Sequence, residues 1–131
     1  MHKSFLSIAA VLGALSVALG AFAAHGLKDK IGPDALAVFE TGVRYQFYHV
    51  FGLLFVGLLS EKFTSKWLLW AGNCFIMGIV FFCGSLYTMT ALKVEQISPM
   101  KLIVIATPVG GVFFIAGWIF LGIALITSEK K

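Results

Sequence analysis

Residues 34–60, DALAVFETGVRYQFYHVFGLLFVGLLS, decide how this chain must fold. Their uninterrupted apolar part, residues 50–59, is too short to cross a hydrocarbon core, which takes about 20 helical residues. Counting about 20 residues back from the end of that part reaches Glu40, which would lie near the membrane edge with Arg44 one turn inside. His49 would then lie roughly 14 Å deep, close to the midplane. We therefore expect a membrane helix that carries polar side chains within the bilayer.

The composition indicates that lipid, not water, surrounds most of the chain. Of its 131 residues, 60% are hydrophobic and 12% are charged, whereas a soluble domain has roughly 25% charged residues. The net charge of +4 comes from short clusters between apolar runs. Such clusters suit anionic lipid headgroups, and they lack the continuous basic stripe of a nucleic-acid-binding protein. We expect the lipid bilayer as the main partner and no nucleic acid.

Two further apolar runs predict membrane helices on either side of this stretch. Residues 4–24 carry no charge and would span roughly 31 Å as a helix. They also resemble a signal peptide, with small residues near Ala23 as a cleavage site, but the run is longer than a usual signal-peptide core and the rest of the chain is equally apolar. The third helix begins near Trp67 and Trp70, since indoles prefer the membrane interface.

The start of the fourth helix has two interpretations. Thr107 and Pro108 suit a helix start, with a capping hydroxyl and a proline in the first turn. Alternatively, Pro99 starts the helix earlier and Pro108 kinks it.

The sequence thus predicts an all-α polytopic membrane protein, with residues 1–131 forming one domain of four transmembrane helices in an up-down bundle. We place these helices at about 4–25, 34–60, 66–89 and 108–127. Four crossings put both termini on the same side. That side has Lys3, Lys62, Lys66, Lys130 and Lys131, against Lys28, Lys30, Lys93 and Lys101 on the other, with Arg44 near its edge, so the count is five against four or five. The positive-inside rule then favours cytoplasmic termini by a small margin.

One half of the second helix is polar when residues are projected at about 100° each. We expect this half to face the bundle, because lipid offers it no hydrogen-bond partners, and the opposite stripe with Val43 and Val50 to face lipid. The crossing pattern brings polar residues of the other helices to the same membrane face. The candidate polar cluster comprises His25, Glu40, Arg44, Tyr45, Tyr48, His49, Ser85, Tyr87 and Thr107.

Two functional interpretations of this cluster are open. In the first, Glu40 and Arg44 form an ion pair, and the cluster is a polar clasp that sets helix order in a structural or accessory protein. This protein would act in a homo-oligomer or with another membrane protein. In the second, His25, Glu40, Arg44 and His49 serve a small proton-linked channel, carrier or ligand-binding protein.

The sequence favours a non-enzymatic protein without a cofactor. It contains no GxSxG, HExxH or phosphate-loop motif, and we assign no catalytic residue. Cys74 and Cys83 show no metal-ligand spacing and fall on opposite faces of one helix, so neither a metal site nor a disulfide within that helix is expected. Small residues indicate close helix packing instead. The candidates for such contacts are Gly13, Gly20, Gly84, Gly110, Gly111 and Gly117.

Several motifs together resemble one known family. They are GAFAAHGL at residues 20–27, YQFYH at 45–49, GSLY at 84–87, TPVGG at 107–111, and Gly117-Trp118. In this order and spacing they resemble the YwdK/YgdD family, small multi-pass membrane proteins of unknown function found mainly in bacteria, with mitochondrial relatives in animals. The resemblance covers nearly the whole chain. It implies a plasma-membrane location and a four-helix topology, and it brings no established activity, cofactor or catalytic residue.

Overall fold

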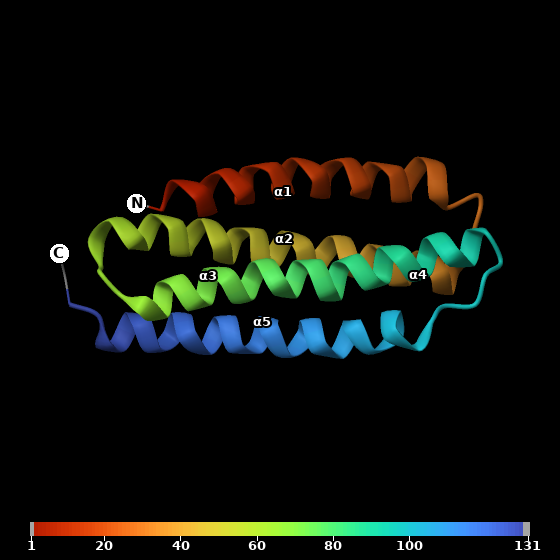
Figure 1. The fold of residues 1–131 in the computed structure, drawn as a ribbon. Helices are drawn as coiled ribbons and strands as arrows, with labels where there is room; N and C mark the ends of the chain where they lie inside the picture. The colour runs from red at the N-terminus through yellow and green to blue at the C-terminus, as the bar shows by residue number, and fades with distance from the viewer. Residues whose placement is uncertain (1, 130–131) are drawn as a thin grey trace.

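The computed structural model describes residues 2–129, which form an antiparallel bundle of long helices (Figure 1). The elements in chain order are α1 (Lys3–Phe22), η1 (Ala23–Leu27), α2 (Pro33–Lys62), α3 (Lys66–Gly78), η2 (Ile79–Cys83), α4 (Gly84–Val94) and α5 (Lys101–Thr127). The two η elements are π-helical and continue their neighbours without a break, so α3, η2 and α4 make one long helix. The described part of the chain therefore crosses the bundle four times, as an all-α up-down arrangement predicts.

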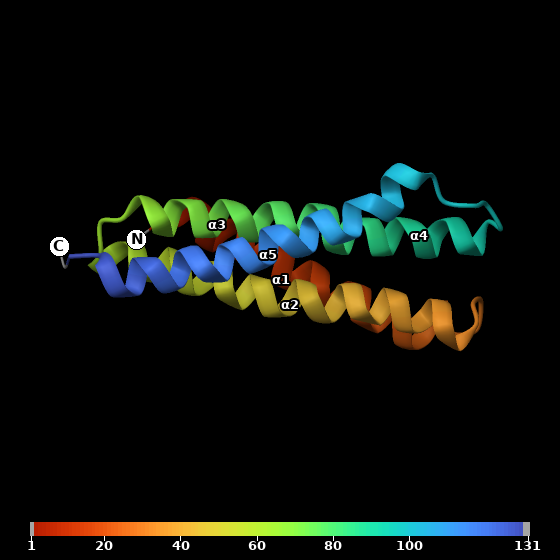
Figure 2. The same cartoon turned by 90° about the horizontal axis from the view of Figure 1, so that it is seen from below.

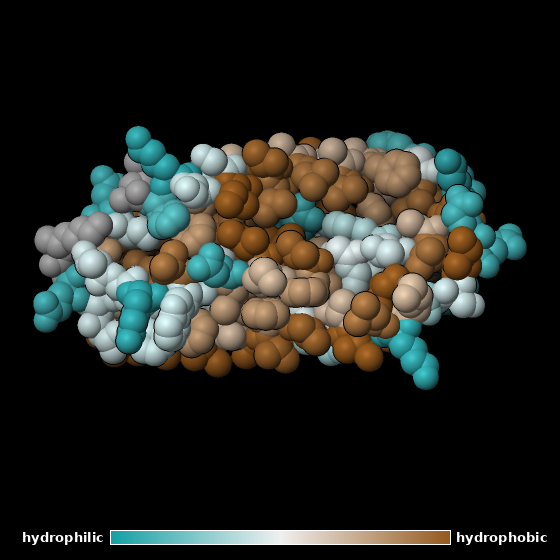
Figure 3. Space-filling view, viewed as in Figure 1, coloured by the Kyte–Doolittle hydropathy of each residue, from teal (hydrophilic) through white to brown (hydrophobic). Residues whose placement is uncertain are grey.

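Within residues 2–129, three of the four long helices are long and apolar enough to cross a membrane. They comprise Lys3–Leu27, Lys66–Val94 and Lys101–Thr127. α2 carries more polar residues but runs alongside them over the same length (Figure 1). In Figure 3 the middle of the visible face is mostly apolar, and hydrophilic residues gather at the two ends. The predicted four-helix membrane fold is confirmed.

Neighbouring helices in the sequence are also neighbours in space. α1 packs against α2, and α2 contacts the long α3–α4 helix, which contacts α5 (Figures 1 and 2). The start of α1 and the end of α5 lie at the same end of the bundle (Figure 1). At the centre, the buried ring of Phe75 on α3 fits between α2 and α5, where Gly52 and Gly117 leave room for it. Both glycines thus let their helices approach a large core side chain closely.

Small residues on α1 explain how α2 is oriented. A Cβ placed on Gly13 would lie 3.5 Å from Val50 Cγ1, and one on Gly20 would lie 3.6 Å from Val43 Cγ1. Both pairs are separated by seven residues in each helix, so a stripe of valines on α2 lies along a stripe of glycines on α1. The prediction that Val43 and Val50 face lipid is wrong, because only 8% and 3% of them is exposed.

α5 begins earlier than the predicted residue 108. It starts at Lys101 and contains Pro108 within the helix, as the alternative interpretation held. Pro108 has no N–H for the carbonyl four residues before it, which weakens the helix at this point. Figure 2 shows the first turns of α5 lying off the axis of the rest. Thr107 is therefore an interior residue of α5 and not its cap.

Candidate functional site

A buried amide joins three of the helices. Gln46 on α2 is 1% exposed. Its Nε2 donates to the carbonyl of Leu12 on α1 at 3.0 Å, and its Oε1 accepts from the Tyr87 hydroxyl on α4 at 2.7 Å. Because an amide both donates and accepts, this one side chain satisfies partners on opposite sides of α2.

A pair of hydroxyls extends these links to the fourth long helix. Ser85 Oγ lies 2.6 Å from Thr107 Oγ1 on α5 and donates its proton to the carbonyl of Phe82 at 2.8 Å. A hydroxyl has a single proton, so Thr107 must be the donor of the bond to Ser85. In the structure the polar clasp is a different set of residues from the predicted one. From here on the name refers to Gln46, Ser85, Tyr87 and Thr107, whose hydrogen bonds connect α1, α2, α4 and α5.

The clasp contains only part of the predicted polar cluster. Ser85, Tyr87 and Thr107 belong to it, but Glu40 and Arg44 are exposed, and within residues 2–129 no ion pair joins them. The predicted orientation of α2 is wrong by roughly a third of a turn about the helix axis, because the buried face is centred on Gln46 and not on the predicted polar half. Gln46 is the residue that sequence reasoning missed. An isolated amide flanked by aromatic residues at mid-membrane depth was the signal that could have identified it.

The remaining predicted residues do not come together. His25 is exposed in η1, at the end of the bundle, and Tyr48 is 52% exposed. In the described part of the chain, no hydrogen bond or ion pair links His25, Glu40 and Arg44 to His49. The proposed four-residue titrating cluster is therefore not assembled, and His49 stands apart from its charged members.

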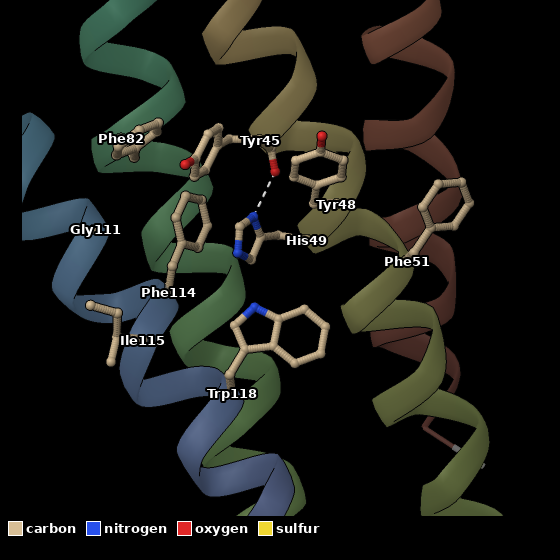
Figure 4. A pocket seen from close by; sticks show the side chains of 9 residues that line it. All are labelled: Tyr45, Tyr48, His49, Phe51, Phe82, Gly111, Phe114, Ile115 and Trp118. Atoms are coloured by element: carbon tan, nitrogen blue, oxygen red, sulfur yellow. Dashed lines mark hydrogen bonds between the residues drawn. The ribbon is translucent and has the colours of Figure 1, made fainter.

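His49 instead lies at a groove between α2 and α5, shown in Figure 4. The groove has a volume of about 710 Å³ and opens at the side of the bundle. Besides His49, Gly111 and Ile115, its lining is aromatic and consists of Tyr45, Tyr48, Phe51, Phe82, Phe114 and Trp118. A volume of this size suits a small organic molecule.

The imidazole of His49 is held in one orientation. Its Nδ1 lies 2.6 Å from the carbonyl of Tyr45, which can only accept, so Nδ1 carries a proton. Its ring stacks on Phe114 with centroids 3.4 Å apart. Only 4% of the residue is exposed. In the neutral imidazole, Nε2 is then left as a hydrogen-bond acceptor.

Nε2 of His49 opens onto the groove. Within residues 2–129 it has no hydrogen-bond partner. The one fully covered side-chain nitrogen or oxygen without a partner in this part of the chain is Ser128 Oγ, so Nε2 must reach the surface. Figure 4 shows it directed away from Tyr45, toward the side of Phe114 and Trp118.

The predicted packing glycines differ in what surrounds them. A Cβ on Gly110 would lie 2.7 Å from the Cα of Phe82, and one on Gly117 would lie 2.7 Å from the ring of Phe75. Gly13 and Gly20 make the ordinary contacts with α2 described above. Gly111 is loosely packed, and a Cβ on Gly84 would meet no atom within 4 Å, so Gly84 mediates no close helix contact.

Neither metal binding nor a disulfide is supported by the described residues. Among residues 2–129, no group of three or more His, Cys, Asp or Glu side chains could hold a metal ion. Cys74 and Cys83 are both free thiols, and Cys83 is buried.

Comparison with known proteins places this architecture in a family. The family described as "Protein of unknown function (DUF423)" matches residues 19–111, which include all four residues of the clasp, His49 and most of the groove lining. The chain belongs to the DUF423 family.

Membrane proteins of several bacteria align over almost the entire chain. The UPF0382 membrane protein YwdK of Bacillus subtilis is 43% identical, over 95% of this chain and 97% of its own length. A UPF0382 membrane protein of Staphylococcus epidermidis is 41% identical, over 95% of this chain and 96% of its own. The UPF0382 inner membrane protein YgdD of Escherichia coli is 35% identical, over 98% and 94%. No solved structure matches the chain. The chain is thus an integral membrane protein of a family without an assigned activity, as its motifs indicate.

Proposed function

We propose that this protein is a non-enzymatic accessory protein of the cell membrane that binds a membrane-dissolved molecule in the groove between α2 and α5. The observation that carries the proposal is the buried His49 ring, held by Tyr45 and Phe114 with its free Nε2 facing the groove. A polar atom without a partner is costly in a low-dielectric environment, so its position favours a bound group that completes it.

The polar clasp supports a binding role because it makes the bundle a fixed frame. Its bonds connect all four long helices and use the hydrogen-bonding groups of Gln46 on both sides of α2. Gly110 and Gly117 bring α5 against the α3–α4 helix on the other side of the groove. A groove held open between rigid elements binds without first ordering its walls.

The groove faces the hydrocarbon and not water. It is entered from the side of the bundle, and the centre of α2 carries His49. We therefore infer that the bound molecule arrives from the bilayer. We also propose that the protein lies in the plasma membrane, which agrees with the name of the inner membrane relative YgdD. The lysine distribution supports a placement of both termini in the cytoplasm.

Site-specific photo-crosslinking in native membranes tests the proposal. A benzophenone amino acid at Ile115, which lines the groove, should capture a small molecule of defined mass. The same residue at Ile119, one turn further and similarly exposed but outside the groove lining, is the matched control. Equal capture of bulk phospholipid at both positions would show that the groove has no preferred occupant.

A further inference from the structure

We propose that the groove binds a neutral ring molecule that carries a hydroxyl group and dissolves in the hydrocarbon core, as a prenylated hydroquinone does. The hydroxyl donates its hydrogen to Nε2 of His49, and the ring lies among the aromatic side chains of α2 and α5. This inference rests on the proposed function and names the chemical class of the occupant.

The protonation of His49 determines which group the groove accepts. Nδ1 holds its proton against the Tyr45 carbonyl at 2.6 Å, so the free Nε2 of the neutral ring is an acceptor. An acceptor needs a donor such as a hydroxyl. A carbonyl or ether oxygen offers only lone pairs to Nε2 and cannot complete it.

The depth of His49 excludes the headgroup of a phospholipid as the donor. Within α2, His49 stands 16 residues after Pro33 and 13 before Lys62, counted as 49 − 33 and 62 − 49. At 1.5 Å per residue these separations are about 24 and 20 Å. Headgroups remain at the surfaces of a core about 30 Å thick. A hydroxyl that reaches His49 must belong to a molecule that takes its polar group into the hydrocarbon.

The groove lining favours a flat and uncharged occupant. Its nine residues include no Asp, Glu, Lys or Arg, so a charged group would find no counter-charge there. Tyr45 and Trp118 are 37% and 47% exposed, which leaves surface for a further ring to pack against. Aromatic rings pair favourably in offset or edge-on arrangements at such walls. A volume of about 710 Å³ accommodates a substituted ring with a short prenyl chain.

A pair of probes that differ only in the donor tests this inference. The full chain in lipid nanodiscs is titrated under argon with a short-chain prenyl hydroquinone and, separately, with its dimethyl ether. Binding is followed by quenching of tryptophan fluorescence, since Trp118 lines the groove. We expect the hydroquinone to bind about tenfold more tightly, which is the scale of one hydrogen bond.

Two variants assign the effect to the site. His49→Phe keeps an aromatic ring and removes the acceptor, so the tenfold preference should disappear while weaker binding of both probes remains. Ile115→Trp fills the groove and leaves His49 in place, so both probes should lose affinity. Ile119→Trp adds the same side chain outside the groove lining and should change nothing.

Each result bears on the inference. Equal affinity of the wild-type protein for the two probes would overturn the hydroxyl–His49 bond but leave a groove that binds ring molecules, so the proposed function would stand. Absence of binding by either probe, combined with crosslinking from Ile115 to a second copy of the chain or to another protein, would overturn both. If His49→Phe fails to fold, loss of binding in Ile115→Trp but not in Ile119→Trp, together with the probe ratio of the wild type, still decides the question.

Discussion

The imidazole of His49 on α2 lies parallel to the phenyl ring of Phe114 on α5, with centroids 3.4 Å apart and 7° between the ring planes. This stack connects two helices that otherwise border an open groove. It also fixes the plane in which His49 presents Nε2. The contact therefore serves both the packing of α5 and the geometry of the candidate binding site.

Replacing Phe114 should weaken both features. The side chain is 4% exposed, and Phe114→Ala should lower the free energy of unfolding by about 3 kcal/mol, as expected for removal of a buried ring. Chemical unfolding in detergent micelles measures the loss. Ile119→Ala, at an exposed position on the same helix, is the control and should cost far less. A similar loss for the two variants would contradict the packing role of Phe114.

The amide of Gln46 should contribute more to the stability of the protein than the exposed Glu40 and Arg44 on the same helix. Gln46→Leu leaves the Tyr87 hydroxyl without its acceptor and removes the link to the Leu12 carbonyl, which keeps its bond from Ser16 Oγ, so the variant should destabilise the protein by about 1–2 kcal/mol. Adding Tyr87→Phe removes the orphaned hydroxyl, so the double variant should be more stable than the sum of the two single losses implies. Strictly additive losses, measured by the same unfolding assay, would reject the Gln46–Tyr87 bond.

Two glycines on adjacent helices provide a matched test of close packing. Gly110→Ala places a Cβ against the backbone of Phe82, which cannot move aside as a flexible side chain can, and should cost about 2 kcal/mol or more. Gly84→Ala meets nothing within 4 Å and should be neutral or stabilise α4 by up to about 1 kcal/mol. Unfolding midpoints of the two variants check this, and equal destabilisation would refute the close contact between Gly110 and Phe82.

Glu40 and Arg44 should behave as independent residues. Neither forms an ion pair with the other, and both are exposed. We expect Glu40→Gln and Arg44→Gln to have additive effects on unfolding, with a coupling free energy below about 0.5 kcal/mol. A double variant that recovers stability lost in the single variants would show that the pair forms in the bilayer after all.

The thiols offer a further check of helix rotation. Cys83 is fully buried, whereas Cys74 is partly exposed. In detergent micelles, a membrane-permeant maleimide should label Cys74 and leave Cys83 unmodified until the protein unfolds. Mass spectrometry of the labelled peptides measures the ratio, and rapid labelling of Cys83 in the folded protein would place η2 in a different rotation.

The candidate site was predictable in its residue types but not in its grouping. Ser85, Tyr87 and Thr107 were expected at one face of the membrane, and the structure puts all three into the clasp. The opposite charges of Glu40 and Arg44 predicted an ion pair inside the cluster. Residues near the membrane edge can instead direct their long side chains to the headgroups. The neutral amide of Gln46 lies deeper in the membrane and cannot reach the headgroups, so it must be paired inside the bundle.

The sequence by itself determined that the chain is a bundle of four membrane helices and how those helices succeed one another. The length of an apolar run has to match the thickness of the bilayer, and charges have to stand between runs, so both can be counted along the chain. This counting also required α2 to carry polar groups into the membrane.

Only the tertiary structure decided which face of each helix is buried. Lipid and the interior of a membrane protein are equally apolar, so the valine stripe of α2 suits either one, and hydropathy alone cannot choose. The contacts of Val43 with Gly20 and of Val50 with Gly13 show that this stripe is buried against α1. That rotation buried Gln46 in the clasp, exposed Arg44, and turned His49 toward Phe114 and the groove.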